Sequence, residues 1–118
     1  MKRLSVVLVL FLMCATAVSA QKTLKGAYAD AFKMGCAVNS SIVNGRDSRS
    51  AQIILQQFNA VSPENDMKAE VLHPSPDRWN FQAADRYVQF AKDNGLWALG
   101  HTLVWHNQTP EAFSHEDY

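Results

Sequence analysis

The chain has 118 residues, which corresponds to one domain or less. Eleven lysine and arginine residues balance eleven aspartate and glutamate residues, and this zero net charge argues against a nucleic-acid-binding protein, which usually carries a basic excess. Hydrophobic residues make up 47% and charged residues 19%, a composition typical of a folded globular chain. Two cysteines are too few for a scaffold held together by disulfides.

The first twenty residues have the pattern of a secretory signal peptide. A short positive segment precedes an apolar run over residues 4–13, and mostly small residues follow up to Ala20. The run is well short of the ~20 residues that span a bilayer, which argues against a membrane anchor. A lipoprotein signal with Cys14 as the lipidated residue is a further alternative, although a methionine precedes this cysteine where a small residue is usual. We therefore expect residues 1–20 to direct secretion or export to a periplasm, and residues 21–118 to form the folded part.

Helix and strand patterns alternate through the rest of the chain. Apolar residues at i, i+3 and i+4 spacing indicate helices, and short apolar runs ended by turn residues indicate strands. The elements that we expect, in chain order, are a helix over 23–32, a strand over 32–38, a loop over 39–48, a helix from Asp47 or Ser48 to Phe58, a strand over 60–62, a loop and helical turn over 64–72, a helix over 83–93 and a strand over 97–104. Strands separated by such helices predict βαβ units and a parallel sheet.

The apolar faces of two helices are expected to supply the core. These faces are Ile53, Ile54, Leu55 and Phe58 on one helix, and Ala84, Tyr87, Val88 and Ala91 on the other. Loss of Cys14 with the signal peptide would leave Cys36 as the single cysteine, which excludes an intramolecular disulfide. We interpret Cys36 as a buried small hydrophobic residue rather than a reactive thiol.

Polar side chains gather where each expected strand ends. They are Asn39 and Ser40 after the first strand, Glu64, Asn65, Asp66 and Lys68 after the second, and His101, Trp105, His106, Asn107 and Gln108 at the third. Ligands of parallel α/β proteins bind at the carboxyl ends of the strands, and these groups suit a polyhydroxylated ligand whose ring can lie on an indole face. The alternative is a solvated loop end with Lys68 paired to a carboxylate, and Trp105 in the core.

Other chemistries have weaker support in the sequence. Glu64 and Asp66 are two residues apart and could form an acid/base pair, but many loops carry two nearby carboxylates. His101 and His106 are five residues apart, which is not the i, i+4 spacing of a helical zinc pair, and Cys36 is distant. The sequence has no G-x-S-x-G nucleophile elbow and no phosphate-binding loop. We expect neither a metal nor a cofactor.

Four segments, in this order, strongly resemble glycoside hydrolase family 10, the family of endo-1,4-β-xylanases. They are SPENDMK at residues 62–68, D-x-x-N-F followed by A-D at 77–85, N-G-L at 94–96, and GHTLVWHNQTP at 100–110. The resemblance extends from about residue 24 to residue 113. One departure is Ala112, which stands before Phe113 at a place where relatives usually have an aromatic residue.

The resemblance implies a (β/α)₈ TIM barrel, of which this chain would hold about the first three β/α units. A complete barrel needs ~250 residues. The resemblance also implies a retaining mechanism with two glutamates ~5–5.5 Å apart, which the family carries on its fourth and seventh strands. We expect both glutamates beyond Tyr118, so Glu64 is not the catalytic acid, and the fragment alone is expected to be inactive.

The family pattern also implies roles for the residues at the strand ends. The residues that match its glycone-side sugar-binding positions are Glu64, Asn65 and Lys68, and those that match the site beside the scissile bond are His101, Trp105 and Gln108. The implied partner is xylan or a xylo-oligosaccharide, with no nucleic acid and no membrane span.

Two functions of different classes stay open on the sequence alone. The parent protein is a secreted endo-1,4-β-xylanase, or the chain is a non-catalytic glycan-binding fragment. The downstream pair of glutamates separates the two.

Overall fold

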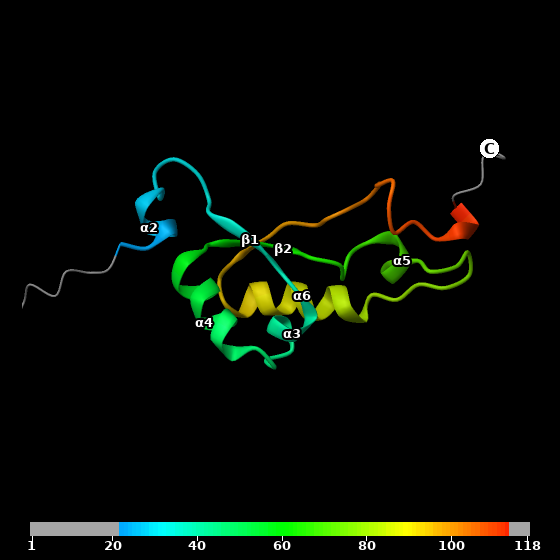
Figure 1. The fold of residues 1–118 in the computed structure, drawn as a ribbon, viewed down its shortest axis with the longest axis horizontal. Helices are drawn as coiled ribbons and strands as arrows, with labels where there is room; N and C mark the ends of the chain where they lie inside the picture. Colours follow the sequence, from blue (N-terminus) through cyan, green and yellow to red (C-terminus); the bar gives the residue numbers. More distant parts are fainter. Residues whose placement is uncertain (1–21, 114–118) are drawn as a thin grey trace, which may run out of the picture.

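The computed structural model describes residues 22–113, which form a small α/β unit (Figure 1). Its helices alternate with three short strands, as the sequence predicted. The elements are α2 (Leu24–Ala27), β1 (Gly35–Val38), α3 (Ser40–Val43), α4 (Ser48–Gln57), β2 (Ala60–Pro63), α5 (Ala69–Leu72), α6 (Gln82–Asp93), β3 (Trp97–Ala98) and the 3₁₀ turn η1 (Glu111–Phe113). The signal peptide that we expect at residues 1–20 lies outside the described residues.

The three strands form a parallel sheet in the order β1-β2-β3. Gly35 pairs with Ala60 and Val38 with Pro63, so β1 and β2 end at the same level. The chain leaves β2 at Pro63, which has no N–H to continue a ladder. The carboxyl ends of neighbouring strands therefore lie side by side, and the loops that follow them share one edge of the sheet.

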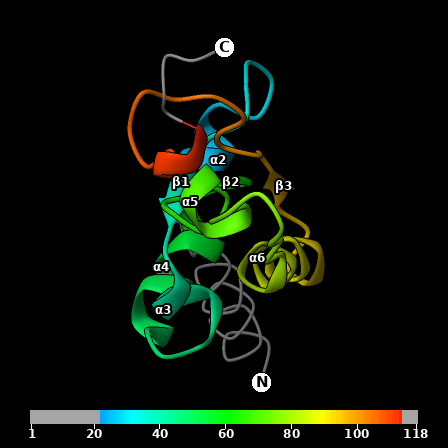
Figure 2. The same ribbon diagram turned by 90° about the vertical axis from the view of Figure 1, so that its right-hand side faces the viewer.

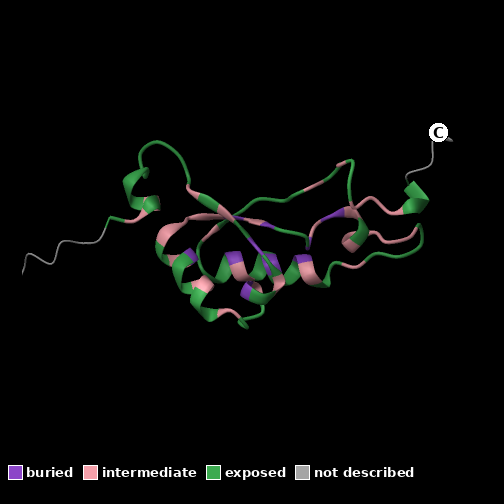
Figure 3. Cartoon of the chain, in the orientation of Figure 1, coloured by how far each residue is buried: buried purple, intermediate pink, exposed green. Residues whose placement is uncertain are grey.

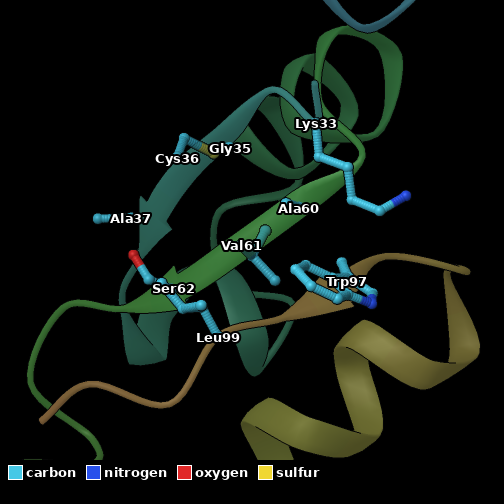
Figure 4. A pocket seen from close by; sticks show the side chains of 9 residues that line it. All are labelled: Lys33, Gly35, Cys36, Ala37, Ala60, Val61, Ser62, Trp97 and Leu99. Atoms are coloured by element: carbon cyan, nitrogen blue, oxygen red, sulfur yellow. The ribbon is translucent and has the colours of Figure 1, made fainter. Parts of the chain in front are cut away.

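The helices cover one face of this sheet and leave the other face open. In Figures 1 and 2, α3, α4 and α6 lie on the same side of the strands. Alternate strand residues face this side, and of these Val38, Val61 and Pro63 are buried. On the opposite side is a hollow of about 700 Å³, shown in Figure 4, whose floor includes Gly35, Ala37, Ala60 and Ser62.

The core is small and centres on Tyr87. Its side chain is 0% exposed, and its hydroxyl lies 2.6 Å from the carbonyl oxygen of Val61 and 3.0 Å from that of Leu99. The Leu99 N–H in turn lies 3.2 Å from the Tyr87 hydroxyl oxygen. This one side chain therefore fixes α6 to β2 and to the segment after β3. The other buried residues of the cluster are Val38, Ile42, Ile54, Val61 and Ala91 (Figure 3).

Side-chain caps start three of the helices. Thr23 accepts the Gly26 N–H, Asn39 accepts the N–H groups of Ser41 and Ile42, and Asp47 accepts the Ser50 N–H. The Asp47 cap agrees with the predicted start of α4. The Asn39 cap explains why the stretch expected to be a loop over 39–48 contains the short helix α3.

Four predicted features are wrong in extent or exposure. The first helix ends at Ala27 instead of residue 32, and the first strand begins at Gly35 instead of residue 32. The third strand stops at Ala98 instead of residue 104: Ala98 makes its last pair, with Val61, and the Leu99 carbonyl accepts the Tyr87 hydroxyl because Pro63 has no N–H to offer it. The expected core faces are also narrower than predicted.

Four apolar residues account for the narrower faces. Ile53 is 51% exposed and Val88 is exposed, whereas Leu55 and Phe58 are half-buried. Only Ile54 of α4 is buried, while Ala84, Tyr87 and Ala91 of α6 confirm the predicted stripe on that helix. Within residues 22–113, no helix is long and apolar enough to cross a membrane.

Candidate functional site

The turn after β2 carries the first group of predicted site residues. Pro63 ends the strand, and the Glu64 N–H donates to the Val38 carbonyl at 2.9 Å, which holds the start of the turn against the end of β1. The Lys68 N–H then donates to the Asn65 carbonyl at 3.0 Å and closes the turn. The turn therefore leaves the sheet at its carboxyl edge, where parallel α/β proteins bind ligands.

Lys68 is the central polar group of this site. It is only 8% exposed, and its Nζ donates to Asn65 Oδ1 at 2.8 Å. The same Nζ lies 4.7 Å from the ring centroid of Trp105, a distance at which the ammonium is attracted by the indole face. The structure thus brings together three of the residues that the sequence singled out. The remaining N–H donors of the ammonium suit the oxygen atoms of a hydroxylated ligand.

The segment after β3 supplies the aromatic wall of the site. Trp105 is half-buried and lies on a loop, rather than at the end of the longer strand that the sequence predicted. The ring centroid of His101 lies 6.4 Å from that of Trp105, and the ring centroid of His106 lies 5.3 Å from it, both in edge-on orientations. His101 is exposed, so its ring nitrogens are accessible to a ligand.

Backbone and side-chain contacts hold this loop close to the turn after β2. The Gln108 carbonyl accepts the Glu70 N–H at 2.9 Å, and the Thr109 hydroxyl donates to the Trp105 carbonyl at 2.8 Å. Gln108 has a φ of 53°, in the left-handed region. Its Oε1 is buried, and within the described residues it has no hydrogen-bond partner. A ligand or a further part of the protein could satisfy this orphaned amide oxygen, which lies on the same loop as Trp105.

The two carboxylates of the turn lie in different environments. Glu64 is exposed, whereas Asp66 is only 9% exposed and both of its oxygens lie within hydrogen-bond distance of the Ser40 hydroxyl. This arrangement does not favour the acid/base pair of Glu64 and Asp66 considered from the sequence, because the Asp66 carboxylate already accepts a hydrogen bond from the Ser40 hydroxyl. The sequence placed both Ser40 and Asp66 at strand ends but assigned them no contact. Their positions after neighbouring parallel strands were the signal that could have predicted it.

A small hollow adjoins His101 on the side of α5. Its volume is about 290 Å³, and its walls are mainly apolar. The residues that line it are Met67, Leu72, Gly100, His101, Thr102 and Leu103. Leu103 is fully exposed, so this hollow opens along the surface of the loop.

Metal and thiol chemistry have little geometric basis in the described part of the chain. Among residues 22–113, no group of three His, Cys, Asp or Glu side chains is arranged to hold a metal ion. Cys36 is half-buried in β1, and burial raises the pKa of its thiol, which makes the reactive thiolate scarcer at neutral pH. Cys36 therefore behaves as the structural residue that the sequence indicated, although it is less buried than expected.

Comparison with known proteins identifies the family. The model of glycosyl hydrolase family 10 matches residues 23–118. The chain belongs to glycosyl hydrolase family 10. Endo-1,4-beta-xylanase B of Paenibacillus barcinonensis is 42% identical over 95 residues, which are 80% of this chain and 27% of that protein. Endo-1,4-beta-xylanase A of Caldicellulosiruptor saccharolyticus is 46% identical over 85 residues, which are 70% of this chain and 23% of that protein.

Solved structures of this family share the fold of the chain. Xylanase 10B of Thermotoga petrophila, solved with xylobiose, has a TM-score of 0.70 and 34% identity over 76% of this chain and 28% of that one. A mutant structure in complex with xylotriose has a TM-score of 0.71 and 41% identity over 83% of this chain and 29% of that one. The chain thus spans about a quarter of the length of these relatives. The predicted family and the predicted partial TIM barrel are both confirmed.

Proposed function

We propose that this family 10 chain is part of a secreted endo-1,4-β-xylanase that hydrolyses internal β-1,4-xylosidic bonds with retention of configuration. The observation that most supports this proposal is the grouping of Lys68, Asn65 and Trp105 at the carboxyl edge of the sheet. Homologous xylanases that cover this region support xylan as the substrate class. Secretion through residues 1–20 is part of the same proposal.

The proposed roles divide the site between the two loops. Asn65 and Lys68 would bind hydroxyls of the glycone sugars, because the amide is exposed and the ammonium has donors beyond the one given to Asn65. Glu64 is exposed at the mouth of the same turn and would accept a hydrogen bond from a sugar hydroxyl. None of these groups supplies the nucleophile or the acid in this proposal.

The loop after β3 would line the sugar beside the scissile bond. The half-buried Trp105 offers a rigid wall against which a sugar ring can lie, and the exposed His101 offers a ring nitrogen to a hydroxyl. Gln108 would meet the ligand, or a group close to it, through its orphaned Oε1. The two catalytic glutamates would come from other strands of the barrel, outside residues 1–118. Residues 21–118 alone would then be inactive.

The test is hydrolysis by the full-length product of the gene. We expect release of reducing sugar from xylan and little from starch, whose helical chain needs a cleft of different shape. The products should initially keep the β configuration at the anomeric carbon, as a retaining mechanism requires, and proton NMR of early products detects this. Activity on starch alone contradicts the proposal. Binding to xylan without hydrolysis by the full-length product would instead support the glycan-binding alternative.

A further inference from the structure

A buried carboxylate links the two loops that follow β1 and β2. Asp66 lies between the exposed Asn65 and the half-buried Met67, yet it is 9% exposed. Its Oδ1 and Oδ2 lie 2.7 and 2.9 Å from the Ser40 hydroxyl oxygen. A hydroxyl has one hydrogen, so Ser40 donates to one oxygen or shares the hydrogen between both. Burial of a carboxylate is costly unless it accepts such bonds, which makes this contact stabilising for the observed turn.

This contact fixes the middle of the turn that presents Asn65 and Lys68. The start of the turn is held by the backbone bond from Glu64 to Val38, and its end continues into α5. Between these points the described contacts that tie the turn to the end of β1 run through the Ser40 hydroxyl and Asp66. Ser40 is itself fixed, because it is the first residue of α3 and follows the Asn39 cap.

We propose that Ser40 and Asp66 are positioning residues that hold the 64–68 turn so that Asn65 and Lys68 present their polar groups to the glycone sugars. The inference rests on the proposed function and adds to it a pair that acts through Asn65 and Lys68. Loss of the hydroxyl leaves Asp66 buried without its donor, and the turn then relaxes towards water. Sugar binding in the ground state and in the transition state weakens together, so KM rises and kcat does not change.

The experiment compares variants of the full-length enzyme on xylotriose and xylotetraose. Ser40→Ala should raise KM about five- to tenfold, and change kcat by less than about twofold, as expected when uniform binding is lost. Ser40→Thr restores a hydroxyl and should return KM to within about twofold of the parent. Asp66→Asn keeps the shape and one acceptor oxygen but removes the charge, so its KM should lie between those of the parent and Ser40→Ala. Ser41→Ala is the matched control, since Ser41 is exposed and next in sequence.

The outcomes separate positioning from a merely structural role. A lower melting temperature in Ser40→Ala with the parent KM per active molecule overturns the inference. If Ser40→Ala yields no folded enzyme, Asp66→Asn and Ser40→Thr are compared with the parent instead. A parental KM in Asp66→Asn then overturns the inference. If the parent enzyme acts on xylan and Ser40→Ala keeps the parental KM, only the positioning role is contradicted. A parent that does not act on xylan contradicts the proposed function, and the inference with it.

Discussion

Lys68 combines burial with an incomplete set of hydrogen bonds. Its ammonium has three N–H donors, and the described contacts give one to Asn65 Oδ1 and place the charge on the face of Trp105. A sheltered hydrogen bond to a charged group is worth ~1.5–3 kcal/mol, which corresponds to about a tenfold or larger effect on binding. The side chain is therefore a strong candidate for measurable control of substrate affinity.

Replacement of Lys68 tests this directly in the complete enzyme. Lys68→Ala should lower kcat/KM on xylobiose to xylotetraose about tenfold or more, and less on polymeric xylan, because long substrates keep contacts elsewhere. The control is Lys92→Ala, which removes an exposed lysine of α6. Lys68→Ala with a normal melting temperature and the parental rate on short substrates would show that the ammonium does not bind sugar.

Trp105 should affect short and long substrates alike. Trp105→Ala removes the aromatic face under Lys68 and the wall that we propose beside the scissile bond, so kcat/KM should fall at least about tenfold on oligosaccharides and on xylan. Trp105→Phe keeps an aromatic face and should recover part of the loss. Melting temperatures of both variants are the accompanying measurement. A fall in thermal stability with unchanged kinetics would place Trp105 in the structural core instead.

At the scale of single elements, Asp47 caps the N-terminus of α4, and its carboxylate makes the stability of the folded state depend on pH. Hydrogen bonds from the Ser50 hydroxyl and then from the Ser50 N–H lower the pKa of Asp47 below its ordinary value of 3.8. A carboxylate with a lowered pKa in the folded state stabilises that state above its unfolded pKa. This contribution is lost as the pH falls through the lower, folded value.

The variant Asp47→Asn keeps a capping oxygen without the titrating charge. We expect the parent to melt above Asp47→Asn at pH 7, and the gap to close as the pH falls below 3.8. Asp30→Asn, which changes an exposed residue outside the helices, is the control and should show no such gap. A gap that is constant from pH 7 to pH 3 would argue against the Asp47 charge as its source.

Tyr87 connects three elements through one hydroxyl. Tyr87→Phe removes its bonds to the Val61 and Leu99 backbone but keeps the ring in the core. Since the Leu99 N–H also donates to the Val61 carbonyl, we expect a modest loss of about 1–2 kcal/mol in the free energy of unfolding. Denaturant unfolding of the full-length protein measures it. The control, Tyr28→Phe, changes an exposed tyrosine, and an equal loss there would contradict the assignment.

An aromatic column explains how the chain accommodates Ala112. The His73 ring stacks on Trp79 at 3.7 Å and on Phe113 at 4.7 Å between centroids, and Trp79 stacks on Phe81 at 5.7 Å. Phe113 therefore fixes η1 to the loop between α5 and α6. Ala112 stands where relatives usually have an aromatic residue, and Phe113, one residue later, makes the aromatic contact of η1 instead.

The sequence predicted those elements whose signals are local. The Asp47 cap and the apolar stripe of α6 located two helices, and the polar residues expected after the second strand do follow β2 at the carboxyl edge of the sheet. The helix α3 was missed because Asn39, Ser40 and Ser41 are typical of loops unless the Asn39 side chain is known to cap. The end of β3 could not be predicted, since the apolar run to Val104 does not reveal which of its residues pair with β2.

The contact between Lys68 and Trp105 was equally beyond sequence reasoning. The two residues lie on separate loops, and their distance depends on how the segment after β3 folds back to α5. The family resemblance supplied residue types for the proposed site, but it did not point to the hydrogen bond between Ser40 and Asp66. Non-local geometry is therefore what the structure adds.

At the scale of the whole molecule, the open face of the sheet limits stability. Trp97 and Leu99 are exposed on this face, and the hollow of about 700 Å³ lies over small residues of β1 and β2 (Figure 4). In a closed barrel this face would be the packed interior. The described core is small, so burial on the helix side has little excess over the cost of ordering the chain.

Residues 21–118 expressed alone should therefore lack a cooperative unfolding transition. We expect aggregation or a broad thermal change, with binding of a hydrophobic dye such as ANS. Calorimetry and dye fluorescence of the purified segment measure both. A control is the full-length product, which should melt sharply. A sharp calorimetric peak from the segment would show that one covered face of the sheet suffices.

The order β1-β2-β3 also has a consequence for protein synthesis. Each strand pairs with its neighbour in sequence, so the strand pairs seen here need no part of the barrel that is made later. The relatives are about four times as long as the matched region, and ribosomes add about 5–20 residues per second. The nascent chain would thus carry an uncovered apolar face for seconds to tens of seconds.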